Sequence, residues 1–360
     1  MNNTKKENLF TLILLVKGRD EFSMRWLKYM DEIDFKYPIV ISDGANDGFI
    51  SQMIKNHTFK NNIKIDFKQF DTNNGFKNYY EMKRDTLKEI KSKYSMICDN
   101  DDFIIESGIT NIINFLEKNN EYISASGKIL SYEIDDMQFK TYGNLNFLPA
   151  YEYSRLLDPV GDWNKQINLV FESFQPNFYN IFKTEVLKKI FKEIVDLNFS
   201  DLVVNEFFIQ LRSNTLGKSK ILSTHHYLRQ RGTSQIFNNF DFSNDLIKKD
   251  LPRDFRKLND YICTIISEQN GLNKQQIKDV LEKSFASYIK KCLIGSMLRY
   301  RYPKLFRIKL FLKSCWLEKL KFISSRIKEL KNKIYLNHRL LDFENKAELI
   351  KIINFLKKNV

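Results

Sequence analysis

The strongest constraint on the fold is the alternation of two kinds of segment over the first hundred residues. Short apolar runs such as "LFTLILLV" (9–16), "YPIVISDG" (37–44) and "YSMICDND" (94–101) alternate with longer stretches of helical character. Strand, helix and strand in succession are typical of βαβ units, whose crossover helices build a parallel sheet that is covered on both faces. The sequence therefore predicts an α/β fold with a doubly wound, Rossmann-like sheet.

The rest of the chain is less regular before it becomes helical. Residues 120–180 are aromatic and rich in turn-forming residues, so we expect a shaped loop region there. The apolar periodicity predicts helices at 184–197 and 200–218, and a strand at 220–231 follows. Beyond that strand the pattern becomes almost wholly helical.

The positive charge of the chain is concentrated near its C-terminus. The formal net charge is +14, and residues 286–335 hold 14 Lys or Arg against two Glu, a balance of +12. In the same segment, apolar residues from Ile308 to Ile334 recur at spacings of three and four, which predicts one amphipathic helical stripe. Two interpretations stay open: this surface binds an anionic membrane, or it packs on the protein with its basic face solvated.

The cysteines and the apolar runs restrict the cellular setting. The four cysteines are scattered, without a CxxC pair, which suits neither a disulfide framework nor a zinc ribbon and favours a reducing cytoplasm. No segment reaches the roughly twenty uninterrupted apolar residues that a membrane-spanning helix needs. Any membrane association is therefore expected to be peripheral.

Three carboxylates directly follow the apolar run that begins at residue 94. Asp99, Asp101 and Asp102 would repel one another there unless a cation or hydrogen-bond donors compensated their charge. Carboxylate oxygens of this kind suit Mg²⁺ or Mn²⁺. A calcium EF-hand is excluded, because its loop needs Gly and Glu where this chain has Ile104 and Thr110. The plain alternative is a solvated turn that caps the next helix.

At this point the chain resembles a known family. The motifs "TLILLVKGRDEF", "IVISDGAND", "NNGFKNYYEMKRDTL" and "MICDNDDF", in this order, are similar to the nucleotide-binding half of the family-2-like glycosyltransferases with the GT-A fold. The likeness is greatest to bacterial members that build surface polysaccharides, and it covers roughly residues 9–235. It implies a GT-A-like mixed sheet in residues 1–240, with the nucleotide-sugar site in 9–105 and the acceptor side and base in 106–240. A basic helical region, 241–360, would follow.

The resemblance also implies the residues that meet the donor. It places Gly18, Arg19 and Asp43 at the nucleoside, Asp99 at the ribose, and Lys83 or Arg84 near the diphosphate. Asp101 and Asp102, in the DxD element, would hold the divalent metal ion, Mn²⁺ or Mg²⁺.

A carboxylate is the usual base for removing the proton of an acceptor hydroxyl. Members of the family carry it at the start of a helix, about eleven residues before a glycine. Glu206 lies eleven residues before Gly217 and is the first candidate, with Asp201 in reserve. The simpler role for both is that of an acidic residue favoured near the positive end of a helix. By resemblance, the reaction would invert the anomeric configuration.

The chain departs from the family where many relatives carry a late metal-binding histidine. Here "YLRQRGTS" places Arg231 near that position, and arginine binds phosphate oxygens rather than a cation. We therefore expect Arg229 or Arg231 to stabilise the leaving diphosphate. His225 or His226 could supply the missing ligand, although adjacent strand residues point to opposite faces, and a structural role is the first expectation for both. Trp163 is a candidate for stacking on an acceptor sugar, although aromatic side chains more often bury themselves.

Other classes fit less well. A sugar-nucleotide pyrophosphorylase carries a Gly-rich loop after its first strand, where "VKGRDEF" has one glycine, and neither a P-loop nor a GxGxxG motif occurs. A nucleic-acid-binding protein with a basic tail is the remaining alternative. We expect instead a transferase that moves a sugar from a nucleotide sugar, a UDP-sugar first, to a hydroxyl of a glycan or lipid-linked acceptor. It would act in the cytoplasm, peripherally at the inner face of the membrane, without a nucleic-acid partner.

Overall fold

The structure is a computed structural model that describes most of the chain. The described residues are 9–45, 47–72, 76–135, 137, 139–147, 162–172, 177–231, 250–301 and 346–358. The stripe from Ile308 to Ile334 lies outside these ranges, so its predicted amphipathic helix stays a prediction.

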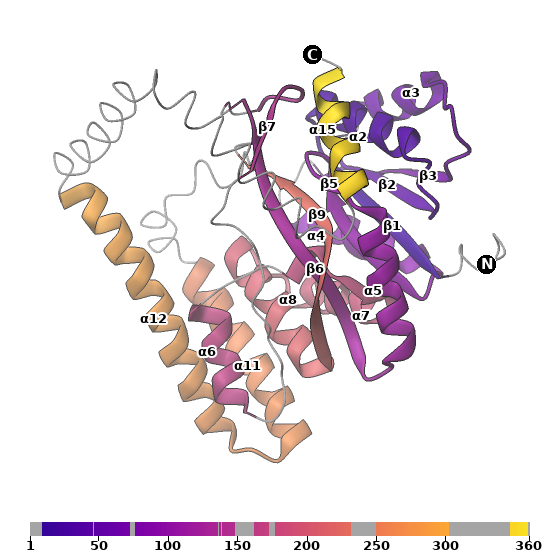
Figure 1. Ribbon diagram of the computed structural model, residues 1–360. Coiled ribbons are helices and arrows are strands. Elements are labelled where there is room, and N and C mark those ends of the chain that lie inside the picture. The colour runs from indigo at the N-terminus through magenta and orange to yellow at the C-terminus, as the bar shows by residue number, and fades with distance from the viewer. Residues whose placement is uncertain are drawn as a thin grey trace.

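Four parallel strands form the first half of the sheet (Figure 1). They are β1 (Phe10–Val16), β2 (Ile39–Asp43), β3 (Ile65–Gln69) and β4 (Tyr94–Asp99), in the order β3-β2-β1-β4. Helices α2 (Asp20–Glu32), α3 (Phe49–Asn56) and α4 (Phe76–Glu89) connect them. The predicted βαβ units are confirmed, and parallel pairing brings the carboxyl ends of these strands to one edge of the sheet.

The second half makes the sheet mixed, as expected. Beyond β4 lie β8 (Ile181–Lys183), β6 (Tyr122–Ile134), β9 (Lys218–Gln230) and β5 (Phe103–Ile104), while β7 (Leu145–Phe147) pairs with β6. The pairs β4–β8, β8–β6 and β9–β5 are antiparallel, and the long pair β6–β9 is parallel. The doubly wound mixed sheet of the predicted fold class is thereby confirmed.

Strand β6 lies in the stretch that the sequence predicted to be irregular, and that prediction was wrong here. Its sequence, "YISASGKILSYEI", interleaves serine and glycine with apolar residues. It therefore lacks the continuous apolar run that marks β1 and β4. Most of β6 is nevertheless buried, because small polar residues fit against the neighbouring strands and helices.

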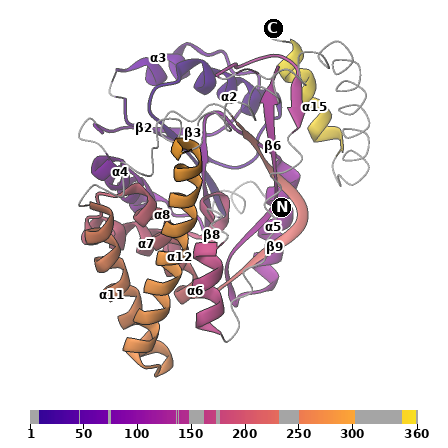
Figure 2. The ribbon, with the colours of Figure 1, turned by 90° about the vertical axis from the view of Figure 1, so that its left-hand side faces the viewer.

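The sheet has a helical layer on each face, and each layer has its own apolar core. One core joins the sheet to α2, α3, α5 (Glu106–Lys118) and α15 (Lys346–Lys358). The other joins it to α4, α6 (Trp163–Glu172), α7 (Thr184–Leu197), α8 (Leu202–Leu216), α11 (Asp250–Asn270) and α12 (Lys274–Arg301). Alternate side chains of β1 serve the two cores: Leu12 and Leu14 face the first, Ile13 and Leu15 the second. Figure 2 shows the two layers from the side.

Helices of the C-terminal third belong to both layers. Helices α11 and α12 pack beside α8 and α6, and α12 extends away from the sheet (Figures 1 and 2). The last helix, α15, buries Leu349, Ile352, Phe355 and Leu356 in the first core, beside α2. Over the described residues, every helix is too short or too polar to cross a bilayer.

Candidate functional site

The site begins at the turn that joins β1 to α2. Gly18 and Arg19 follow each other with φ values of +68° and +59°, a left-handed conformation that glycine adopts without strain. The Arg19 carbonyl then accepts hydrogen bonds from the amides of Phe22 and Ser23 and starts α2. This sharp turn brings the Arg19 side chain back over the carboxyl end of the sheet, where its Nη1 donates to Asp101 Oδ2 at 2.7 Å.

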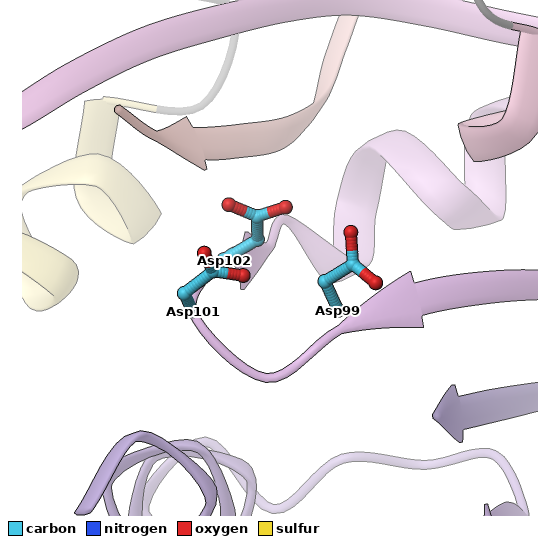
Figure 3. Close-up of side chains that lie close together, drawn as sticks. All are labelled: Asp99, Asp101 and Asp102. Atoms are coloured by element: carbon cyan, nitrogen blue, oxygen red, sulfur yellow. The ribbon is translucent and has the colours of Figure 1, made fainter. Parts of the chain in front are cut away.

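Asp99, Asp101 and Asp102 form a compact acidic cluster at the end of β4. Each offers a carboxylate oxygen, and these oxygens lie within 4.8 Å of one another. Figure 3 shows the three side chains on the same side of the turn that leaves β4. Asp101 and Asp102 are buried and Asp99 is partly buried. The solvated turn considered as the alternative does not describe this arrangement.

The three carboxylates have different partners. Both oxygens of Asp102 accept hydrogen bonds from β9, one from the Tyr227 hydroxyl and one from the backbone amide of Gln230, each at 2.7 Å. Asp99 accepts from the Tyr179 hydroxyl at 2.9 Å. Burial and the charges of Asp101 and Asp99 raise the pKa of Asp102 well above its usual range. Burial and Asp101 likewise raise the pKa of Asp99.

This cluster fits a hard divalent cation. Its ligand set consists of carboxylate oxygens, and burial with mutual repulsion, which raises the pKa of Asp99 and Asp102, disfavours the charged forms that a bound cation would stabilise. The Arg19 guanidinium supplies part of that compensation at Asp101. Asp102 accepts hydrogen bonds through both oxygens and Asp99 and Asp101 each accept at least one, but a carboxylate has about four lone-pair sites, so each could still bind an ion.

A second group of charged side chains, on α4, α8 and β9, interacts electrostatically with the cluster. Burial raises the pKa of Glu206, on α8, to about 7, while the positive charges of Lys83 and Arg229 oppose that rise. Burial lowers the pKa of Lys83, on α4, to about 7, against the charges of Asp99 and Glu206. The structure therefore brings Glu206, Lys83, Arg229 and Asp99 close enough for their charges to interact.

Aromatic rings enclose Lys83. The side chain is 3% exposed, and its Nζ lies 4.0 Å from the ring centroid of Tyr79, 4.5 Å from that of Phe178 and 4.7 Å from that of Tyr80. Arg84, the alternative on the same helix, instead pairs with Asp85 at 2.8 Å on a partly exposed face. Of the two candidates, the structure brings Lys83 to the acidic cluster.

The remaining predicted residues lie in less distinctive surroundings. Asp201 is the N-cap of α8, and its Oδ1 accepts from the Val204 amide at 3.0 Å. The Arg231 amide donates to the Tyr132 carbonyl just beyond β9. Trp163 begins α6, where its partly buried ring packs on the second core. Asp201 and Trp163 thus have structural contacts that account for them.

Asp43, at the end of β2, has an unusual environment. The side chain is 0% exposed, and Oδ1 accepts from the Ala45 amide at 2.9 Å. Within the described part of the chain, Oδ2 is buried without a hydrogen-bond partner. Burial raises the pKa of this carboxyl group. A buried acceptor without a partner is costly, so this oxygen is suited to a donor group from a ligand.

Sequence patterns did not identify the two tyrosines that hold the acidic cluster, which lie on β9 and just before β8. Tyr179 and Tyr227 stack with ring centroids 4.4 Å apart and donate to Asp99 and Asp102. His226 lies beside them, with Nδ1 accepting from the Gly127 amide and Nε2 at 3.0 Å from the Tyr179 carbonyl. Burial lowers the pKa of His226 to about 4, as expected for a neutral structural histidine.

The fold is that of the GT-A-like glycosyltransferases, as the sequence resemblance implied. Residues 1–349 of S. aureus TarS, determined alone and in complex with UDP-GlcNAc, match with a TM-score of 0.50 and 13% identity, over 94% of this chain and 89% of that one. Mannosyltransferase PcManGT from Pyrobaculum calidifontis, in complex with GDP-Man and Mn²⁺, matches with a TM-score of 0.41 and 11% identity, over 82% of both chains. Neither a family model nor a curated protein sequence matches the chain. At this low identity, the likeness to TarS shows the fold alone.

Proposed function

We propose that the protein is a glycosyltransferase that moves a sugar from a nucleotide sugar, with a UDP-sugar as the first choice, to an acceptor hydroxyl. The observation that carries this proposal is a compact acidic cluster at the carboxyl edge of a GT-A-like sheet, near enough to Glu206 for Asp99 to affect the pKa of that residue. This edge is where ligands bind in open α/β sheets. The complex of TarS with UDP-GlcNAc supports the choice of donor.

The nucleoside would bind at the ends of β1 and β2. Asp43 offers a buried oxygen without a partner, which can accept a hydrogen bond from the base or ribose. Gly18 and Arg19 form the turn beside it, and the missing side chain at Gly18 leaves open space. Asp99, partly exposed at the end of β4, would meet the ribose or the metal ion.

A divalent ion, Mn²⁺ or Mg²⁺, would be held by Asp101, together with Asp99 or Asp102. Such an ion supplies Lewis-acid stabilisation of the charge that develops on the departing diphosphate. Arg229 contributes positive charge near the same position, and Lys83 does so when it is protonated, since both interact with Asp99. Arg231 is a second candidate for the diphosphate, and Arg84 a weaker one.

Glu206 would act as the general base toward the acceptor hydroxyl, with inversion at the anomeric carbon. A carboxyl group with a pKa of about 7 is a stronger base than an ordinary glutamate and still ionises near neutral pH. Asp201 is the second candidate. Its role as N-cap of α8 gives it a structural reason to be present, so Glu206 is favoured.

The acceptor would be a glycan or a lipid-linked molecule in surface polysaccharide synthesis. The concentration of positive charge in residues 286–335 supports a location at the anionic inner face of the membrane, and no nucleic-acid partner is proposed. Trp163 is the candidate for stacking on the acceptor sugar.

Calorimetric titration with UDP and GDP, each with and without Mn²⁺, tests the donor site. We expect UDP to bind, and Mn²⁺ to tighten binding at least tenfold in the wild type but not in D101N. The matched control is D196N, which removes an exposed carboxylate on α7 that pairs with Lys192 and leaves the effect of Mn²⁺ unchanged. Failure of both nucleotides to bind would refute the proposed function.

A further inference from the structure

Arg25, on α2, is a buried charged residue that the proposed reaction does not use. Its side chain is 0% exposed. Nη2 donates to the Asp101 carbonyl oxygen at 2.5 Å, and Nη1 donates to Gln230 Oε1 at 2.7 Å and to the Thr141 carbonyl oxygen at 2.8 Å. These three acceptors are neutral oxygens. Because burying a guanidinium group is costly, this position needs a reason beyond packing.

The partners of Arg25 are the groups that fix the acidic cluster. The backbone amide of Gln230 donates to Asp102 Oδ1. The guanidinium that holds the Gln230 side chain therefore also fixes the strand residue that binds Asp102. The other end of the guanidinium holds the backbone of Asp101 itself. The Tyr132 hydroxyl lies 3.2 Å from both acceptors, Asp101 O and Gln230 Oε1, and completes the network.

Two aromatic rings fix the plane of the Arg25 side chain. Its Cζ lies 4.9 Å from the ring centroid of Phe22 and 4.8 Å from that of Phe103, the residue directly after Asp102. A planar fork that donates from two nitrogens while lying against rings is a geometry that lysine cannot reproduce. The arrangement is therefore specific to arginine.

A neighbouring contact ties the same loop to α2. Asn100 Nδ2 donates to Ser23 Oγ at 2.8 Å and lies 3.3 Å from the Arg19 carbonyl oxygen. The acidic turn is thus attached to α2 at two successive residues, by Asn100 through its side chain and by Asp101 through its backbone. Rigid support of this kind sets ligand geometry more closely than a loop does alone.

We propose that Arg25 is a positioning residue that sets the directions of the Asp101 and Asp102 carboxyl groups before a metal ion or a diphosphate binds. The effect on ligand binding rests on the proposed function. Arg25 itself would not touch the ligand and would act only through the residues that it holds. It makes α2 the support on which the metal-binding carboxylates are aligned.

Amide hydrogen exchange of the ligand-free protein tests the positioning directly. We expect R25K and R25M to exchange at least tenfold faster in peptides covering residues 99–104 and 226–231, relative to β1. The control is R212M, because Arg212 is also buried but pairs with Glu193, on α7. Exchange at the two peptides should be unchanged in R212M. Protection equal to the wild type in both Arg25 variants would overturn the proposal.

Metal binding provides the second measurement. Free Mn²⁺ is measured by electron paramagnetic resonance with UDP present, and UDP affinity without metal by calorimetry. We expect R25K and R25M to weaken Mn²⁺ binding at least tenfold while UDP alone binds within twofold of the wild type. Equal losses of both affinities would show a merely structural role and overturn the proposal. A wild type that binds neither UDP nor Mn²⁺ refutes the proposed function, whereas the exchange measurement still decides the role of Arg25.

Discussion

Substitution of Asp102 distinguishes a carboxylate that holds the fold from one that binds the metal ion. The side chain is 2% exposed, and its two oxygens accept from the Tyr227 hydroxyl and the Gln230 amide. In D102A both donors lose their acceptor in a buried place. Each unsatisfied donor costs about 1 to 3 kcal/mol, and relief of the negative charge offsets part of this. We expect the free energy of unfolding to fall by about 2 to 4 kcal/mol.

The isosteric variant should behave differently. In D102N the amide oxygen still accepts from the Gln230 amide, and the amide nitrogen can donate to the Tyr227 hydroxyl, which then accepts. Removal of the charge also relieves repulsion from Asp99 and Asp101. We therefore expect the free energy of unfolding to change by no more than about 1 kcal/mol.

D102N and the wild type should also differ in how their stability depends on pH. The pKa of Asp102 is raised in the folded state, so the folded protein holds this proton more tightly than the unfolded chain does. This contribution to stability is complete below the unfolded pKa of about 4 and is lost as pH rises through the folded pKa. D102N lacks the group, so its stability relative to the wild type should increase over that interval.

Urea denaturation followed by tryptophan fluorescence measures these differences, because Trp26 is fully buried on α2. Calorimetry of UDP with Mn²⁺ completes the assay. If D102N were as unstable as D102A, the assignment of its hydrogen bonds would be wrong. If D102N were stable but bound Mn²⁺ more than tenfold more weakly, Asp102 would be a metal ligand instead.

Four further substitutions test the catalytic and nucleoside positions. E206Q should lower kcat by roughly 10² to 10⁴ with UDP affinity unchanged, whereas D201N should keep activity and lose no more than about 2 kcal/mol of stability as a helix cap; the reverse pattern in sugar-transfer assays would make Asp201 the base. K83M removes a positive charge that lowers the pKa of Glu206, so the acid limb of the kcat profile should move to higher pH, above about 7. An unmoved limb would show that Lys83 does not affect the ionisation of Glu206. D43N should weaken UDP binding at least tenfold without loss of thermal stability, since Asp43 Oδ2 lacks a partner in the described protein; a lower melting temperature with normal UDP affinity would contradict this role.

Local sequence patterns were sufficient for the parts of the site that depend on neighbouring residues. The apolar runs of β1 and β4 placed Arg19 and Asp101 at strand ends, and parallel pairing then brought them to the same edge. Helix α7 was predicted at the range it occupies, Thr184–Leu197, because its apolar periodicity is regular. These elements are determined by residues close together in the chain.

The supporting residues could not be predicted in this way. The Tyr227 hydroxyl reaches Asp102 across 125 residues of sequence, and the Arg25 guanidinium reaches Gln230 across 205. Their contacts depend on the pairing of β5 and β9 and on the position of β6, which has no continuous apolar run. Sequence patterns indicate which residues are reactive, whereas tertiary packing decides which residues orient them.

The position of α15 affects how the protein is made. Phe355 contacts the rings of Tyr29 and Phe103, and the Leu356 carbonyl oxygen accepts from the Gly143 amide. These groups are synthesised more than two hundred residues apart, so the surface of Tyr29 and Phe103 that contacts Phe355 stays uncovered until residues 346–358 emerge. Chaperones that bind apolar surfaces during translation would stay bound longest to this face. A premature stop before α15 would leave it uncovered and prone to aggregation.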